Sequence, residues 1–238
     1  MSQVKTQIER EQIMNRKKIA TALIFDMDGL MLDTERMAQR AWQQAGAAAG
    51  YTFTPEIYLQ AVGRTKADTA MLFRQSFGSD FPFDALYEQK TALLLDMLER
   101  EPIPTKRGLF DLLDFLEQWG VRKAVATSTH RTLALHKLAR TGLLDRFEHV
   151  TAGDEVAHGK PAPDIFLASA DALSVTPADC FVLEDSEAGV RAAHAAGMQV
   201  IAVPDLKQPS AQVAALATAV VDSLKEVIEL LSEEVREA

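Results

Sequence analysis

The chain of 238 residues is 47% hydrophobic and 25% charged, which is enough to bury one sizeable core and a small second domain. Its formal net charge of −9 argues against a nucleic-acid or anionic-membrane partner, because both need a basic surface. The single cysteine, Cys180, rules out a disulfide framework and lies in the apolar run CFVLE, so we expect a small buried side chain. We therefore predict a globular cytoplasmic protein with no nucleic-acid or membrane partner, and we take it to be a monomer.

Residues 1–18 are polar and contain neither glycine nor proline, so we expect a frayed helix or a disordered leader, to which we assign no function. The basic residues 16–18 precede an apolar stretch, as in a secretory signal. That stretch is too short and ends in Asp26, so we reject a signal peptide.

The run ALIFDMDGLMLD, residues 22–33, carries the strongest functional signal in the chain. Its apolar start suits a fully buried strand, which places Asp26 where the strand leaves the sheet and Asp28 just beyond it. Two like charges at a strand end repel each other unless a cation or a proton lies between them. We therefore expect either a divalent metal here or one strongly shifted pKa.

Residues 34–103 lack the alternation of strands and instead contain helix-compatible runs. We predict helices over Glu35–Ala49, Pro55–Ala61, Lys66–Phe77 and Asp84–Arg100. Pro102 and Pro104 mark the return to the rest of the chain. We therefore divide the chain into a core of residues 19–33 and 104–238 and a helical insert of residues 34–103.

From Arg107 onward, helices and strands alternate. We predict helices over Leu109–Trp119, Leu133–Arg140, Asp164–Leu173, Glu187–Ala196 and Leu224–Val235. We predict strands in VRKAVAT, EHVTAG, CFVLE, MQVIAV and ATAVV. Such alternation requires right-handed crossovers, so we expect an α/β fold with a Rossmann-like parallel sheet and helices on both faces.

Polar side chains follow the ends of the predicted strands. The second strand ends in Thr127 and Ser128, the loop after the third leads to Lys160, and the fourth ends in Glu184 and Asp185. Ligands of open parallel sheets bind beyond the carboxyl ends of the strands, so these groups are expected to meet at one edge. Alone, each has an ordinary explanation: Thr127 or Asp185 could cap a helix, and Lys160 could be a solvated loop residue.

Taken together and in chain order, these groups resemble the four motifs of the haloacid dehalogenase-like superfamily. The motifs here are DMDGLMLDTE (Asp26–Glu35), ATST (Ala126–Thr129), GKPAPD (Gly159–Asp164) and VLEDSEAGV (Val182–Val190). The resemblance covers residues 19–221. The insert resembles the small helical cap of the branch that holds β-phosphoglucomutase and the small sugar-phosphate and nucleotide phosphatases. The runs HGKPAPDIFLASA and AAGMQVIAVP are similar to those of pseudouridine 5'-phosphatases.

The resemblance implies a Mg²⁺-dependent phosphatase that works through an aspartyl-phosphate. Asp26 would be the nucleophile, and Asp28 would be the acid and base, provided that its pKa is raised toward neutrality. Thr127 would hydrogen-bond a phosphoryl oxygen, with Ser128 beside it in the substrate site. Lys160 would bring the positive charge that an acidic chain otherwise lacks.

The resemblance also implies a Mg²⁺ site, and this ion prefers oxygen ligands. Asp26, the backbone carbonyl of Asp28, and Asp185 would be ligands, while Glu184 would bind the metal or hold a metal-bound water. Gly29 would let the chain turn close to the substrate phosphate and so belongs to the expected substrate site.

Within the insert, Gly63 is followed by Arg64, Thr65 and Lys66 at a predicted loop-to-helix junction. On charge alone, a solvated helix start and a substrate contact are equally good explanations. In the resembling family this loop closes over the substrate, so we include Arg64, Thr65 and Lys66 among the expected substrate-binding residues.

A phosphatase acting on a sugar phosphate or nucleoside monophosphate competes with three other interpretations. In β-phosphoglucomutase a histidine shortly after the first motif assists the transfer, whereas Ala38 stands near that place here, which weakens a phosphomutase. A phospho-accepting signalling module needs neither the acid at Asp28 nor a lid. A dehalogenase is disfavoured because halide leaves without protonation, so Asp28 would be surplus. The core motifs do not identify the substrate, because specificity depends on the shape of the cap.

Overall fold

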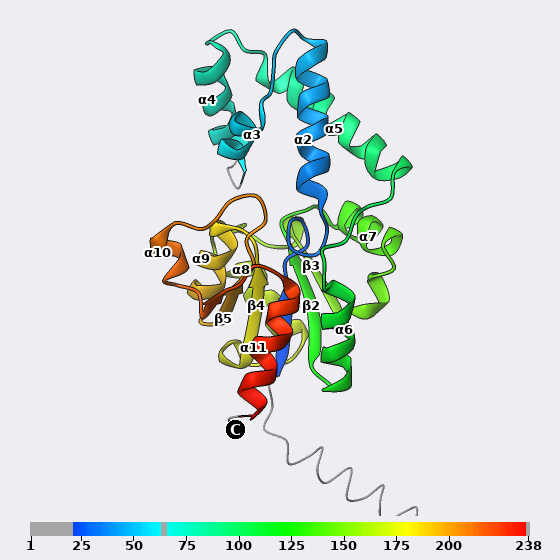
Figure 1. Cartoon of the computed structure of the whole chain (residues 1–238), viewed down its shortest axis with the longest axis vertical. Helices are drawn as coiled ribbons and strands as arrows, with labels where there is room; N and C mark the ends of the chain where they lie inside the picture. Colours follow the sequence, from blue (N-terminus) through cyan, green and yellow to red (C-terminus); the bar gives the residue numbers. More distant parts are fainter. Residues whose placement is uncertain (1–20, 63–65, 237–238) are drawn as a thin grey trace, which may run out of the picture.

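The computed structural model describes residues 21–62 and 66–236, so the expected leader lies outside the described part. Within that part, six parallel strands form one sheet in the order β3-β2-β1-β4-β5-β6 (Figure 1). The strands are β1 (Ala22–Phe25), β2 (Arg122–Thr127), β3 (His149–Ala152), β4 (Cys180–Glu184), β5 (Gln199–Ala202) and β6 (Ala219–Val220). The predicted α/β fold is confirmed. Most strands are shorter than predicted, because the apolar pattern continues past the residues that pair.

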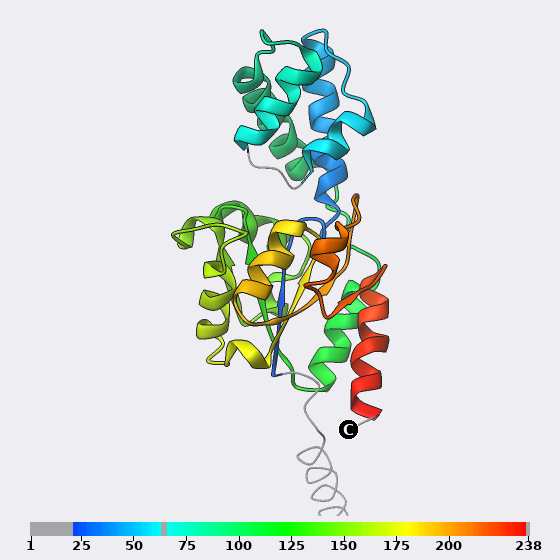
Figure 2. The same cartoon turned by 90° about the vertical axis from the view of Figure 1, so that its left-hand side faces the viewer.

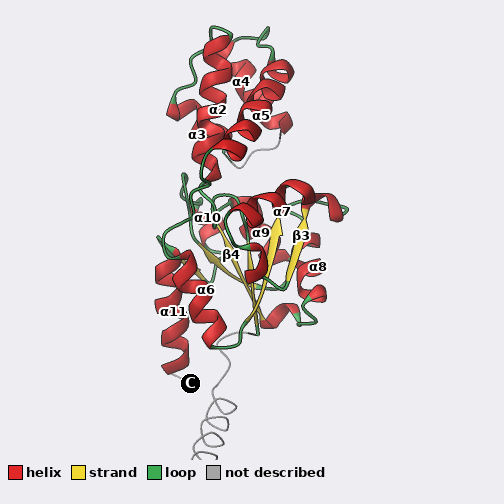
Figure 3. Cartoon of the chain, turned by 90° about the vertical axis from the view of Figure 1, so that its right-hand side faces the viewer, coloured by secondary structure: helices red, strands yellow, loops and turns green. Residues whose placement is uncertain are grey.

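Helices cover both faces of the sheet, as Figures 2 and 3 show. They are α6 (Leu109–Gln118), α7 (Arg131–Arg140), α8 (Asp164–Ala172), α9 (Glu187–Ala195), α10 (Ala211–Ala214) and α11 (Leu224–Arg236). Short 3₁₀ turns, η1 (Leu144–Arg146), η2 (Gly153–Glu155) and η3 (Pro177–Asp179), were not predicted, because a single turn carries no hydrophobic periodicity. None of the described helices combines the length and apolar character needed to cross a membrane.

Strand β1 is buried on both faces, because successive side chains of a strand point to opposite sides. Leu23 and Phe25 belong to an apolar cluster with α6, α7 and α11, whereas Ala22 and Ile24 belong to a second cluster with α8 and α9. All four side chains are fully buried. This two-sided burial explains why the first strand is apolar without alternation.

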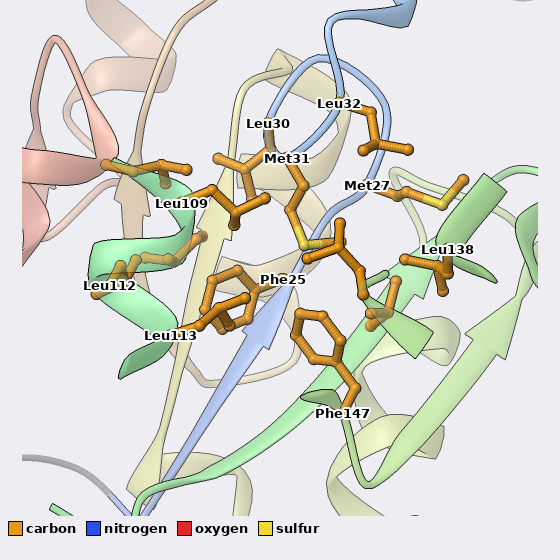
Figure 4. Close-up of a cluster of buried hydrophobic side chains, with 14 of the residues drawn as sticks. Phe25, Met27, Leu30, Met31, Leu32, Leu109, Leu112, Leu113, Leu138 and Phe147 are labelled. Atoms are coloured by element: carbon orange, nitrogen blue, oxygen red, sulfur yellow. The ribbon is translucent and has the colours of Figure 1, made fainter. Parts of the chain in front are cut away.

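The turn that follows β1 is anchored by apolar side chains (Figure 4). Met27 and Leu30 are buried in the same cluster as Phe25, whose ring meets that of Phe147 edge-on with centroids 5.4 Å apart. Burying each such side chain stabilises the fold by roughly 1.5–3 kcal/mol. Because Met27 lies between the two acids of the first motif, its burial fixes the backbone that presents both of them.

The insert forms a helical cap with an aromatic core of its own (Figure 1). Its helices are α2 (Thr34–Ala48), α3 (Pro55–Ala61), α4 (Lys66–Phe77) and α5 (Phe83–Arg100), each within one residue of the predicted bounds. The ring of Trp42 stacks on Phe53 at 5.2 Å and meets Phe73 edge-on at 5.0 Å. Such aromatic pairs add to the stabilisation from burial, so the cap packs as a unit distinct from the sheet.

Two chain segments join the cap to the core, and they run side by side. The amide of Asp33 donates a hydrogen bond to the carbonyl of Pro104 at 2.8 Å. Asp205, in the loop after β5, accepts hydrogen bonds from Arg36 at 3.1 Å and from Lys106. One carboxylate of the core is therefore tied to both connections.

Cys180 opens β4 and is fully buried, as predicted. Burial raises the pKa of its thiol to about 11, and the nearby charge of Asp179 adds to the effect. Because the thiolate is the reactive form, the folded protein should react with dithionitrobenzoate on the order of 100-fold more slowly than the protein unfolded in guanidinium. Release of thionitrobenzoate should reach one equivalent only after unfolding. Rapid and complete labelling of the folded protein would contradict this burial.

Candidate active site

The carboxyl ends of three adjacent strands meet below the cap. Asp26 follows β1 directly, Thr127 is the last residue of β2, and Glu184 is the last residue of β4. In the sheet, β1 lies between β2 and β4, so the chain leaves β1 where the order of the strands reverses. Ligand sites of open parallel sheets lie at such points.

A cavity of about 510 Å³ opens at this edge and is lined from both core and cap. The predicted core residues that line it are Asp26, Asp28, Thr127, Ser128, Lys160 and Asp185. The cap lines it with Glu35, Ala38, Val62, Lys90 and Leu94. The structure therefore brings residues of all four motifs together in one place.

Lys160 is the central cation of the site. Its Nζ donates hydrogen bonds to Asp26 Oδ1 at 2.5 Å, to Glu184 Oε1 at 2.7 Å and to the carbonyl of Ala126 at 3.0 Å. Only 5% of the side chain is exposed. Burial lowers the pKa of Lys160, but the two carboxylates outweigh this effect and raise it, so the side chain is an ammonium.

Asp26 is the predicted nucleophile, and its carboxyl is buried. Burial raises the pKa of Asp26 to about 7, although Lys160 opposes the shift, and the charges of Glu184 and Asp28 add to it. One strongly shifted pKa was expected from the crowding of acids at this strand end. The shift means that burial and the neighbouring carboxylates together outweigh the ion pair with Lys160.

Both oxygens of Glu184 already have donors. Oε1 accepts from Lys160, and Oε2 accepts from the amide of Ser186 at 2.8 Å and from its hydroxyl at 2.9 Å. The side chain is fully buried, and helix α9 approaches it so closely that a Cβ built at Gly189 would lie 1.7 Å from Oε1. Glu184 therefore holds Lys160 and the start of α9, and a metal would have to share its oxygens with these donors, so its role at the metal stays a prediction.

Asp185 has the opposite environment. Among the described residues, its carboxylate makes no hydrogen bond or ion pair, and it lies against Gly29, where a Cβ would approach Oδ2 to 2.0 Å. The positive φ of Gly29, +92°, is a second reason for glycine at this turn. Burial, followed by the charges of Glu184 and Asp26, raises the pKa of Asp185.

A divalent cation would balance these acids. Mg²⁺ binds proteins through one or two carboxylates and keeps water or substrate oxygens in its other positions. Asp26 and Asp185 fit that donor set, and a carbonyl such as that of Asp28 suits it too. Among the described residues, no group of three or more acidic, histidine or cysteine side chains is arranged to hold a metal ion. At this site the ammonium of Lys160 lies between the carboxylates of Asp26 and Glu184.

Asp28 differs from the sequence-based expectation. Thr34 Oγ1 donates to its Oδ1 at 2.5 Å, Thr129 Oγ1 donates to its Oδ2 at 2.6 Å, and Lys137 Nζ donates to Oδ1 at 2.6 Å. Burial raises the pKa of Asp28, but Lys137 and the two hydroxyls outweigh it and lower the pKa. The acid role that the resemblance implies for Asp28 carried the condition of a pKa raised toward neutrality, and the structure does not meet this condition, because the sequence pattern did not reveal the ammonium of Lys137.

The sequence did carry a signal for Lys137. It lies on α7 three residues after Ala134 and directly before Leu138, and all three are buried. A lysine within the buried stripe of an amphipathic helix needs an internal partner, because an unpaired buried ammonium is strongly destabilising. Helical register could therefore have marked Lys137 as a candidate.

The cap side of the cavity contains a second polar group that sequence reasoning missed. Tyr58 Oη donates to Glu35 Oε2 at 2.7 Å and to the carbonyl of Glu35 at 3.1 Å. Burial raises the pKa of Glu35, although this hydrogen bond opposes the shift. Lys90 lies over the rings of Tyr87 at 5.5 Å and Trp42 at 6.0 Å, and burial lowers the pKa of its ammonium.

The predicted cap loop is only partly described. Arg64 and Thr65 lie outside the described residues. Lys66 is exposed, pairs with Asp84 Oδ1 at 3.3 Å and lies 4.6 Å from the ring centre of Tyr87. It lines a smaller cavity of about 190 Å³, which shares Glu35 and three other residues with the larger one. Lys66 therefore borders the site without reaching the strand ends.

Known proteins resemble the chain in sequence and fold. A family model described as haloacid dehalogenase-like hydrolase matches residues 20–197. Fructose-1-phosphate phosphatase YqaB of Escherichia coli is 36% identical over 76% of this chain and 95% of its own. A phosphorylated carbohydrates phosphatase of Thermotoga maritima is 30% identical over 89% of this chain and 98% of its own. The chain also resembles the crystal structure of CbbY from Rhodobacter sphaeroides in complex with phosphate, with a TM-score of 0.70 and 28% sequence identity. The match covers 87% of this chain and 96% of the CbbY chain.

The close approach of Gly189 to Glu184 predicts an unusual stability effect. In a helix interior, replacing glycine by alanine normally stabilises by about 0.5–1 kcal/mol. Here the new methyl group would displace the Glu184 carboxylate from Lys160, so Gly189→Ala should lower the free energy of unfolding by about 1–3 kcal/mol. Urea denaturation followed by circular dichroism measures the change.

Gly159→Ala is the matched control for this substitution. A Cβ at Gly159 would meet no atom within 4 Å, so its effect should stay within about 0.5 kcal/mol. If Gly189→Ala were as stable as the wild type or more stable, the Glu184 carboxylate would not occupy the position described.

Proposed function

The chain belongs to the haloacid dehalogenase-like hydrolase family, and we propose that it is a Mg²⁺-dependent phosphatase that cleaves a phosphorylated carbohydrate through an aspartyl-phosphate on Asp26. The observation that supports this most directly is the contact between Asp26 and Lys160, 2.5 Å, beside a cavity that extends to the cap. Two of the matched relatives are named as phosphatases of phosphorylated carbohydrates. The cytoplasmic location and the monomeric state remain predictions.

In the first step, an oxygen of Asp26 attacks the phosphorus atom, and the bond between phosphorus and the ester oxygen breaks. The leaving oxygen takes up a proton, from Asp28 when that residue is protonated and otherwise from water, and Asp26 becomes an acyl phosphate. Thr127 donates a hydrogen bond to a phosphoryl oxygen, and the Lys160 ammonium offsets the developing negative charge. Mg²⁺ held by Asp26, Asp185 and the carbonyl of Asp28 would let the anionic carboxylate approach the anionic phosphate.

In the second step, water attacks the phosphorus atom of the aspartyl-phosphate. The bond between phosphorus and the Asp26 oxygen breaks, a proton passes from the water to Asp28, and inorganic phosphate leaves. A base must be unprotonated before it acts, and the lowered pKa of Asp28 provides that state. Asp28 is therefore best suited to act as the base that hydrolyses the aspartyl-phosphate. It can act as an acid in the formation of the aspartyl-phosphate only after it gains a proton.

The cap side of the cavity supports a polyhydroxylated leaving group. Glu35 is oriented by Tyr58 and lines both the larger cavity and the adjoining one, as does Lys90. A carboxylate accepts hydrogen bonds from sugar hydroxyls, and an ammonium donates to their lone pairs. Arg64, Thr65 and Lys66 remain predicted substrate contacts, and of these the structure describes Lys66, which borders the site.

The same geometry weighs against a phosphomutase. Ala38, near the place where β-phosphoglucomutase carries a histidine, lines the cavity with a methyl group and so cannot hydrogen-bond a reorienting sugar phosphate. We therefore retain the phosphatase as the proposed function.

A phosphate-release screen tests this proposal. The wild-type protein should hydrolyse p-nitrophenyl phosphate and a subset of sugar phosphates with Mg²⁺, and EDTA should abolish the activity until Mg²⁺ is restored.

Asp26→Asn should lower kcat by about 10⁴-fold or more, because the amide is a poor nucleophile and cannot form the acyl phosphate. A circular dichroism spectrum like that of the wild type is the control for folding. Retained turnover by the Asn variant would refute the nucleophile assignment, and isomerisation of glucose 1-phosphate without phosphate release would establish a mutase.

Leaving-group dependence tests the two steps assigned to Asp28. In Asp28→Ala, kcat should fall for every substrate, because the second step loses its base. The ratio kcat/KM reports the first step, so it should fall by about 10²–10⁴-fold for sugar phosphates but little for p-nitrophenyl phosphate, whose leaving group needs no proton. An equal loss of kcat/KM on both substrates would contradict any role of Asp28 as an acid.

A further inference from the structure

Lys137 is a buried cation in the proposed active site to which no motif assigns a role. It lies on α7, is 4% exposed and lines the 510 Å³ cavity. Among the described residues, Asp28 is the one hydrogen-bond acceptor of its ammonium, at 2.6 Å. A well-packed apolar side chain is often at least as stabilising as a buried ion pair, so folding alone does not explain a lysine here.

The carboxylate of Asp28 is held by three donors from different elements. Thr34 is the first residue of cap helix α2, Thr129 lies in the loop after β2, and Lys137 lies on α7. Thr129 and Lys137 follow the same strand that ends in Thr127, the proposed phosphate-binding hydroxyl. Two of the three donors therefore belong to the core, on the chain segment that also positions the phosphoryl group.

Lys137 differs from the other two donors in the oxygen of Asp28 that it contacts and in the domain to which it belongs. Lys137 and Thr34 both contact Oδ1 of Asp28, while Thr129 contacts Oδ2. Thr34 belongs to cap helix α2, so Lys137 is the donor that holds Oδ1 from the core side. Because both partners are charged, the contact of the Lys137 ammonium with Oδ1 restrains the carboxylate more firmly than the contact of the Thr129 hydroxyl with Oδ2.

We propose that Lys137 is a positioning residue that aligns the Asp28 carboxylate for hydrolysis of the aspartyl-phosphate. The inference rests on the proposed phosphatase reaction, and it extends that reaction by naming the group that holds its base. In the second step the base must lie within hydrogen-bond reach of a water that is also in line with the phosphorus atom. A displacement of about 1 Å can slow such a reaction by about 100-fold.

The substitution Lys137→Met tests the proposal, because it keeps the length of the side chain and removes the ammonium. With p-nitrophenyl phosphate, kcat should fall by about 10–100-fold while kcat/KM changes by less than about threefold, since the first step needs no proton from Asp28. Rapid mixing should show a burst of p-nitrophenol approaching one equivalent of enzyme, and acid quenching should trap the covalent phosphate. Lys137→Arg, which keeps a positive charge, should recover part of the lost kcat.

Lys123→Met is the matched control. Lys123 is also buried, and it pairs with one acid, Glu117, at 3.2 Å, but it does not line the cavity. The control should show the kcat of the wild type and no enlarged burst, because it removes a buried lysine without touching Asp28.

Several results would overturn the inference. If Lys137→Met kept the kcat of the wild type, or lost kcat and kcat/KM equally, Lys137 would not act through the second step. If that variant failed to fold, Thr129→Val would replace it, since loss of the other core donor should give the same burst and the same split between kcat and kcat/KM. Failure of the proposed function itself would look different, because the wild type would then form no covalent phosphate that depends on Asp26.

Discussion

The arrangement of the site depends on the ammonium of Lys160. Asp26, Glu184 and Asp185 gather at the ends of β1 and β4, and burial raises the pKa of Asp26 and of Asp185. Lys160 contacts Asp26 and Glu184 at once and thereby holds two neighbouring strands of the sheet to the loop before α8. Since one cation cannot balance three carboxylates, Asp185 is left without a partner among the described residues. A site that is ordered but one positive ion short is suited to a divalent metal and an anionic substrate.

The fold makes such crowding possible because the strand that carries Asp26 is buried on both faces. Two separate apolar clusters meet at β1, and Met27 continues the burial between the two acids of the first motif. Repulsion between the acids therefore cannot push the turn away without exposing these side chains, each of which contributes roughly 1.5–3 kcal/mol when buried. The hydrophobic core thus holds the polar groups in an arrangement that they would not adopt alone.

The fold and the core side of the site could be predicted from sequence because both follow from local patterns. Apolar runs give the strands, and the rule for parallel sheets places Asp26, Thr127, Glu184 and Asp185 at one edge. Lys160 needed the resemblance of its motif as well, since a loop lysine alone is ambiguous. These predictions required no knowledge of how the helices are rotated.

The residues that were missed depend on rotation and on the placement of the cap. Lys137 reaches Asp28 only because one face of α7 turns toward β1, and a lysine on a helix is ordinarily assigned to solvent. Glu35 and Lys90 come from different cap helices, which meet over the core only in the folded chain. The sequence could not give the direction of the Asp28 pKa shift for the same reason, since that direction depends on Lys137. The two acids of the first motif consequently have opposite surroundings: the pKa of Asp26 is raised by burial, whereas donors lower that of Asp28. Neighbouring acids whose environments push their pKa values apart can take different roles, which is what the proposed reaction asks of Asp26 as phosphate carrier and of Asp28 as base.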